Sequence, residues 1–151
     1  MKNQFRKLIS FLFLFTLTSV AGFSQKIEHV ILIGSDGFGA YAFEKAKVPN
    51  LRAMMQEGSW SLEARTVLPS SSAANWASMV MGAGPELHGY TTWGSKKPDM
   101  PARVLDEYGM FPSVYSLLRK ERPDSEIGVI YEWDGIGYLF PKAAVNHDQN
   151  A

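Results

Sequence analysis

The stretch VLPSSSAANWASMVMGAGPELHGY, residues 67–90, decides how the chain folds around it. Three serines, residues 70–72, stand directly before a segment whose apolar residues recur at helical spacing. We expect that helix to turn these residues toward the core: Ala73, Trp76, Met79 and Val80. A serine at the N-cap stabilises a helix by ~1 kcal/mol, and one cap needs one serine. The free amides and positive dipole of a helix start also favour an anion. The residues alone leave capping and anion binding equally open.

The flanking segments alternate between strand and helix patterns. The expected order is a buried inner strand at 27–33, helices at 40–47 and 49–56, a strand at 60–68, the helix after the serines, a helix at 111–124, a strand at 126–133 and the start of another at 143–145. In the 111–124 helix, Val114, Leu117 and Leu118 are expected to face inward. The alternation predicts an α/β fold with a mostly parallel sheet and helices on both faces.

Two polar elements follow expected strands. Asp36 comes directly after the 27–33 run, and the serines at 70–72 come directly after the 60–68 run. Ligands of such sheets bind at the carboxyl ends of the strands. The sequence therefore predicts a carboxylate and a hydroxyl close together at one edge of the sheet.

Residues 1–24 have the pattern of a signal peptide. A basic start precedes an apolar run at 8–20, and Gly22 and Ser24 occupy the small-residue places of a cleavage site. The apolar run is shorter than the ~20 residues that a spanning helix needs, so no stable membrane span is expected after cleavage. Residues 25–151 are expected to be exported, to the periplasm or the extracellular space.

Composition excludes several classes of function. Removing the leader takes three of the 15 basic residues and none of the 15 acidic ones, which leaves a formal charge of −3. Such a charge predicts no nucleic-acid-binding surface. The chain has no cysteine, so disulfides and cysteine zinc sites are excluded. Any metal would need oxygen and imidazole ligands.

Four stretches, taken in order, resemble the type I phosphodiesterase and nucleotide pyrophosphatase branch of the alkaline phosphatase superfamily. They are HVILIGSDGFGA (29–40), VPNLRAMMQEGS (48–59), ARTVLPSSSAANWASMVMGAGPELHGY (64–90) and GVIYEWDGIGYL (128–139). The resemblance implies that residues 25–151 form the N-terminal part of an alkaline-phosphatase-like hydrolase domain, with that fold incomplete.

The resemblance also implies roles for two residues. The Asp-Gly that ends the first strand makes Asp36 a metal ligand, and the Pro-x-x-Ser pattern from Pro69 makes Ser72 the catalytic nucleophile and a second metal contact. Two zinc ions ~4 Å apart would activate Ser72 and the water that hydrolyses the phosphoserine. The implied substrate is a small phosphodiester, phosphomonoester or nucleotide pyrophosphate.

The chain departs from the family pattern where the substrate is held. After the His-Gly turn the family places an asparagine that contacts a phosphoryl oxygen, and this chain has Trp93 at about that place. Thr91, Thr92 or Asn75 is a candidate to take over the contact. The expected substrate-binding residues are therefore Asn75, Thr92 and Trp93.

The family completes its two-zinc site with a downstream Asp-x-x-x-His, an Asp-His pair and a further histidine, and no such motif occurs up to Ala151. We therefore expect an N-terminal part of a longer hydrolase that is inactive by itself. His88, in its turn, is expected to be a structural hydrogen-bonding residue. The alternative is a non-catalytic exported α/β module that binds an anion or a partner through the helix start at 70–72.

Overall fold

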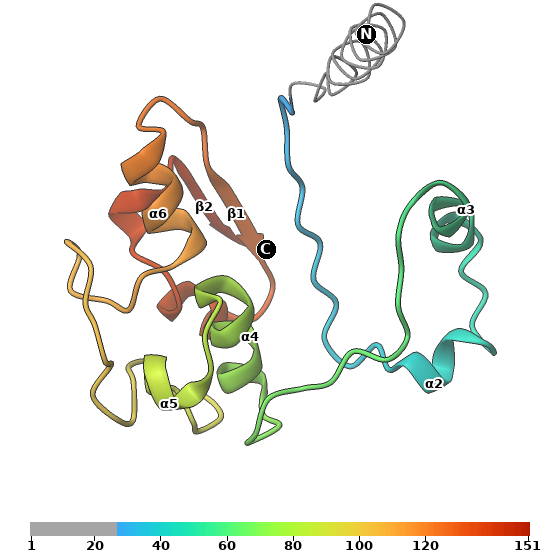
Figure 1. Ribbon diagram of the computed structural model, residues 1–151, viewed down its shortest axis with the longest axis horizontal. Coiled ribbons are helices and arrows are strands. Elements are labelled where there is room, and N and C mark those ends of the chain that lie inside the picture. Colours follow the sequence, from blue (N-terminus) through green and yellow to red (C-terminus); the bar gives the residue numbers. More distant parts are fainter. Residues whose placement is uncertain (1–26) are drawn as a thin grey trace, which may run out of the picture. The chain divides into compact units, whose positions relative to one another are not determined.

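The computed structural model describes residues 27–151 (Figure 1), and the chain divides into two units, residues 1–35 and 36–151. Of the first unit it describes residues 27–35. The expected signal peptide and its cleavage site lie outside the described residues. Within residues 27–151, no helix has the length and apolar character needed to cross a membrane.

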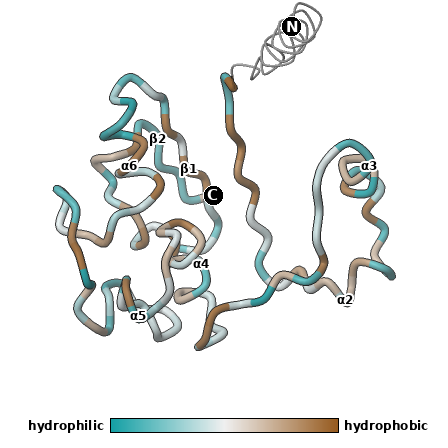
Figure 2. Tube along the Cα trace, in the orientation of Figure 1, coloured by the Kyte–Doolittle hydropathy of each residue, from teal (hydrophilic) through white to brown (hydrophobic). Residues whose placement is uncertain are grey.

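Residues 27–35 form neither a helix nor a strand, although the segment is largely apolar (Figure 2). Its large apolar side chains are exposed, from 73% at Ile27 to 84% at Ile33. The expected inner strand at 27–33 is therefore wrong for this structure. A strand requires a hydrogen-bonded neighbour, and no part of the chain that the structure describes pairs with this segment.

The second unit is α/β. Its elements are α2 (Ala40–Phe43), α3 (Pro49–Glu57), α4 (Ser72–Met81), α5 (Pro85–His88), α6 (Val114–Glu121), β1 (Gly128–Tyr131), the 3-10 helices η1 (Asp134–Tyr138) and η2 (Lys142–Ala144), and β2 (His147–Asn150). β1 and β2 pair in parallel, with Gly128 opposite His147. In residues 27–151 the sheet has these two strands, so the fold class is confirmed in its α/β character.

The expected helices and strands agree with the structure unevenly. The helices at 49–56 and after the serines are confirmed as α3 and α4, and the 126–133 strand is confirmed as β1. The strand expected at 60–68 is wrong, because the segment has no strand and Trp60 and Leu68 are exposed. A segment with alternating apolar residues becomes a strand where a neighbouring strand accepts its hydrogen bonds, and the described residues provide no such neighbour for 60–68.

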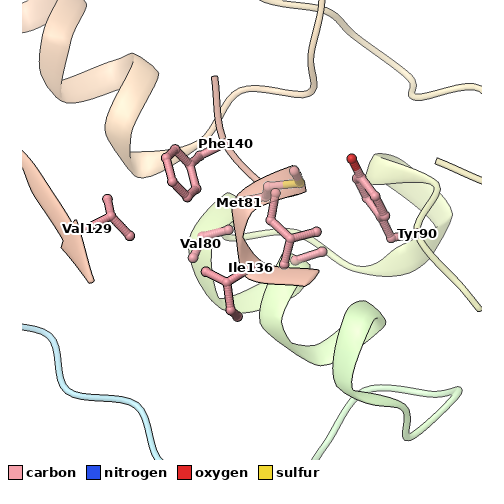
Figure 3. Close-up of a cluster of buried hydrophobic side chains, with 8 residues drawn as sticks. Val80, Met81, Tyr90, Val129, Ile136 and Phe140 are labelled. Carbon is pink, nitrogen blue, oxygen red and sulfur yellow. The ribbon is translucent and has the colours of Figure 1, made fainter. Parts of the chain in front are cut away.

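α4 is the central helix of the core. Ala73, Ala74 and Ala77 are at most 1% exposed, and α5, α6 and η1 all contact this helix. Figure 3 shows the surrounding cluster, whose buried members are Ala77, Val80, Met81, Tyr90, Val129, Ile136, Leu139 and Phe140. Met79 was expected in this core but is 55% exposed. With 3.6 residues per turn, Met79 lies on the side of α4 opposite the alanines.

α6 is confirmed as a helix, but its expected inward face is wrong. Val114, Leu117 and Leu118 are 38–52% exposed, whereas Ser113 and Ser116 are buried. The two serines form a capping box: Ser116 N–H donates to Ser113 Oγ over 3.3 Å, and Ser113 N–H donates to Ser116 Oγ over 2.9 Å. Because each satisfies the other, a polar face of the helix can be buried.

Gly89→Ala is expected to destabilise the second unit more than Gly109→Ala does. Both glycines have a left-handed φ, 83° and 74°, which costs an alanine about 1–2 kcal/mol. A Cβ at Gly89 would also collide with the carbonyl oxygen of Met100, while nothing lies within 4 Å of one at Gly109. Urea unfolding followed by circular dichroism measures both losses. Equal losses would contradict the backbone collision.

Candidate functional site

Asp36 and Ser72 are in direct contact. Ser72 is the first residue of α4, and its Oγ donates a hydrogen bond to Asp36 Oδ2 over 2.9 Å. Asp36 lies 36 positions earlier, at the turn that precedes α2. The structure therefore brings together the two residues that the sequence proposed as metal ligand and nucleophile.

The Asp36 carboxylate accepts two further hydrogen bonds. Trp76 Nε1–H donates to Oδ2 over 3.2 Å, and Gly37 N–H donates to Oδ1 over 2.8 Å. The hydrogen bond from Ser72, then that from Trp76 and to a smaller extent that from Gly37 hold the pKa of the Asp36 carboxyl below its usual value. The exposed carboxyl is therefore ionised near neutral pH, with its charge next to the Ser72 hydroxyl.

Trp76 contacts the candidate site, although sequence reasoning assigned it to the core alone. Its ring packs against the core cluster as expected, but its N–H reaches out to Asp36. Ser72 and Trp76 are four positions apart, a spacing that puts two side chains on the same face of a helix. That spacing was the signal in the sequence that could have linked Trp76 to the site.

The serines do not cap α4. Ser71 is the N-cap residue, yet its side chain makes no capping hydrogen bond. Its Oγ instead donates to the Thr91 carbonyl oxygen over 3.4 Å, and the Ser72 Oγ points to Asp36. The first amides of a helix have no partner inside the helix. This start of α4 therefore combines free donors with a hydroxyl committed to a carboxylate.

Asn75, an expected substrate-binding residue, holds the segment before α4. Its Oδ1 accepts a hydrogen bond from Val67 N–H over 2.9 Å, and its Nδ2 donates to the Ser71 carbonyl over 2.9 Å. Both ends of the amide are thus engaged with backbone. The side chain fixes the approach of the chain to Ser72.

Thr92 and Trp93, the other two expected substrate-binding residues, lie on an exposed loop after α5. Trp93 is 67% exposed, and its ring is nearly parallel to that of Trp133, with 6.3 Å between centroids. The loop is tied to the α4 start because the Thr91 carbonyl accepts the hydrogen bond from Ser71. These two side chains are available to a ligand from that loop.

His88 is a structural hydrogen-bonding residue, as expected. It is fully buried; Nδ1 accepts from Tyr90 N–H over 3.1 Å, which leaves the proton on Nε2 to be donated to Ser78 Oγ over 3.0 Å. Burial holds the pKa of the imidazole below its usual value, although nearby Glu86 raises it. His88 is therefore neutral and joins α4 to the turn that leads into the loop.

Asp36 and Ser72 bring two oxygen donors together. Oxygen atoms are donors of the kind that zinc or magnesium accepts. Across residues 27–151, no group of three or more histidine, aspartate or glutamate side chains could hold a metal ion. A zinc ion takes four ligands, so Asp36 and Ser72 fit such an ion only together with further ligands.

A comparison with protein families bears on this geometry. A family model described as type I phosphodiesterase / nucleotide pyrophosphatase matches residues 30–106, half of the chain, and the match includes both Asp36 and Ser72. The chain belongs to the type I phosphodiesterase/nucleotide pyrophosphatase family. This is a hydrolase family of phosphodiesterases and pyrophosphatases. Neither the curated proteins nor the solved structures yielded a match.

In this family member, Ser72→Ala is expected to raise the pKa of the Asp36 carboxyl, and Trp76→Phe to raise it by less. The Ser72 hydrogen bond is the largest cause of the low pKa, and the Trp76 bond is the second. NMR titration of the carboxyl carbons measures both changes, with Ser70→Ala as the control in the same cluster. A larger rise in Trp76→Phe than in Ser72→Ala would reverse the assigned order.

His88→Asn is expected to make folding stability less dependent on pH. Because the pKa of folded His88 is lowered, the unfolded chain takes up the proton first, so stability falls as the pH drops below the usual histidine pKa of about 6.5. Asparagine keeps an acceptor for Tyr90 N–H and does not titrate. Urea midpoints between about pH 5 and pH 8 test this. An unchanged pH dependence in the variant would rule out a contribution of His88 to the pH dependence of folding stability.

Proposed function

We propose that the protein hydrolyses a small phosphoester, which is a phosphodiester, a phosphomonoester or a nucleotide pyrophosphate, with Ser72 as the nucleophile. The observation that carries this proposal is the hydrogen bond from Ser72 Oγ to Asp36 Oδ2, within a chain of a hydrolase family. A serine hydroxyl attacks poorly near neutral pH unless it is oriented and activated. Asp36 orients the Ser72 hydroxyl by accepting its hydrogen bond.

In the proposed reaction, Ser72 Oγ attacks phosphorus in line with the leaving group. The Oγ–P bond forms as the bond from phosphorus to the leaving oxygen breaks; the hydroxyl proton passes to solvent, and the leaving oxygen takes a proton from solvent. Water then attacks the phosphoserine, which releases the phosphoryl group and restores the hydroxyl. The backbone amide of Ser72, at the start of α4, is suited to bind a phosphoryl oxygen, whereas the next two amides belong to Ala73 and Ala74, which are at most 1% exposed.

Asp36 is better suited to orient and ligate than to act as a general base. A general base works best when its pKa is near the operating pH, and the hydrogen bonds from Ser72 and Trp76 move the pKa of Asp36 away from that range. We propose that Asp36 and Ser72 bind zinc together with further ligands. The bound ion would favour the deprotonated hydroxyl and stabilise charge on phosphorus oxygens.

Thr92 and Trp93 are the proposed substrate contacts. Both lie on the exposed loop that Ser71 ties to the α4 start, and Trp93 presents an open aromatic face. Asn75 supports the site indirectly, because its amide is engaged with the segment before α4. We further propose an alkaline-phosphatase-like fold for residues 25–151 and export by the leader at residues 1–24.

A second candidate function is a non-catalytic module that binds an anion at the start of α4. The observation that favours it is that residues 27–151 hold no group of three or more metal-ligating side chains. Such a module would bind phosphate at the Ser72 amide and would not turn over substrate. Turnover and its dependence on zinc separate the two candidates.

Ser72→Ala is expected to lower hydrolysis of bis-p-nitrophenyl phosphate and p-nitrophenyl phosphate by about 1,000-fold or more, as loss of a nucleophile does. The covalent phosphoenzyme should disappear from intact mass spectra. Ser70→Ala is the matched control, since Ser70 is exposed on the same run of serines. Full activity in Ser72→Ala would move the nucleophile elsewhere. A wild-type protein that binds phosphate without turnover would favour the module.

A further inference from the structure

The Asp99 carboxylate gathers the loop that carries Thr92 and Trp93. Its Oδ2 accepts from Thr91 N–H over 2.8 Å, from Thr91 Oγ1 over 3.0 Å and from Thr92 N–H over 2.8 Å. Its Oδ1 accepts from Ser95 Oγ over 2.8 Å. Hydrogen bonds to an ionised acceptor are the stronger kind. We call this set of contacts the Asp99 clamp.

The clamp holds an exposed loop, to which the stacking of Trp93 on Trp133 also contributes order. Thr92 and Trp93 are exposed, so apolar burial contributes little there, and loops with few buried contacts open easily. The donors, first among them Thr91 N–H, keep the pKa of the Asp99 carboxyl far below its usual range. Asp99 is therefore a permanent anion at the pH of any ordinary assay, and the clamp stays closed.

The clamp is connected to the candidate nucleophile through one residue. Thr91 gives its N–H and its hydroxyl to Asp99, while its carbonyl accepts the hydrogen bond from Ser71 Oγ over 3.4 Å. Ser71 precedes Ser72 and is the N-cap of α4. On the other side of Thr91, Tyr90 is 2% exposed and its hydroxyl donates to the Tyr138 carbonyl over 2.9 Å. The orientation of the Thr91 carbonyl is thus set from both sides.

We propose that Asp99 is a positioning residue that sets the place of Ser71 and Ser72 through Thr91, and holds Thr92 and Trp93 beside them. Its role in turnover rests on the proposed function, whereas its effect on the α4 start does not. A nucleophile misplaced by about 1 Å can lose about 100-fold in rate. Sequence reasoning had assigned Asp99 no role.

The test uses three variants of the protein. Asp99→Ala removes all four acceptor contacts. Asp99→Asn keeps an oxygen for Thr91 and Thr92 and puts an amide toward Ser95 Oγ, which can accept. Asp106→Ala is the matched control: Asp106 also holds a loop, with Oδ1 accepting from Tyr108 N–H over 2.9 Å and Met110 N–H over 3.1 Å, and no contact links it to the serines.

In Asp99→Ala, kcat is expected to fall about 10- to 100-fold, with KM changed less than about threefold, because the nucleophile is displaced more than the substrate is released. Asp99→Asn should recover most of kcat, and Asp106→Ala should leave it near wild type. Hydrogen exchange by mass spectrometry should show faster exchange in Asp99→Ala over residues 69–73 as well as 90–96. Only the second segment is in direct contact with Asp99.

Exchange that speeds up over 90–96 alone, with kcat unchanged, would overturn the positioning role. An equal fall in kcat in Asp106→Ala would overturn it too, since general loss of stability would then explain both variants. If the wild-type protein hydrolyses no phosphoester, the proposed function fails. The exchange of residues 69–73 then still decides whether Asp99 positions the α4 start.

Discussion

The tight packing of the alanine face of α4 against the core is the constraint on which the rest of the second unit depends. Ala73, Ala74 and Ala77 are at most 1% exposed, and side chains this small let neighbouring elements pack directly against the helix. Added volume in such a packed position forces backbone shifts. Because the alanines fix the rotation of α4 about its axis, they also fix the outward direction of Ser72 and Trp76.

The outward face of α4 contacts the exposed carboxylate of Asp36. Asp36 accepts hydrogen bonds from a hydroxyl, an indole and a backbone amide. The donors stabilise the anion, so the carboxylate keeps its charge and gives up basicity. This arrangement favours orientation of the Ser72 hydroxyl and ligation of a cation over proton abstraction. Under the proposed function, a bound metal ion would then be the group that activates the hydroxyl.

The turn after α5 separates a buried, hydrogen-bonded scaffold from the exposed loop that carries Thr92 and Trp93. His88 and Tyr90 are buried and hydrogen-bonded on the scaffold side, and Thr92 and Trp93 are exposed on the other. Functional loops on rigid scaffolds are common because the loop can meet a ligand while the scaffold holds its ends. Here the loop is held by polar contacts to Asp99 and by the stacking of Trp93 on Trp133, so its order depends on charge and hydrogen bonds as well as on an aromatic contact.

Local patterns in the sequence determined the elements whose signals are complete within a few residues. The helix patterns at 49–56 and after the serines predicted α3 and α4, the Asp-Gly and Pro-x-x-Ser patterns made Asp36 and Ser72 candidates, and the His-Gly turn predicted a structural role for His88. The tertiary structure decided whatever depends on a distant partner. The strand patterns at 27–33 and 60–68 did not become strands, because a strand exists only with a hydrogen-bonded neighbour. Likewise α6 buries Ser113 and Ser116 and exposes its leucines, and Asp99 acts on Thr91, because satisfied hydrogen bonds and packing across the fold override residue type.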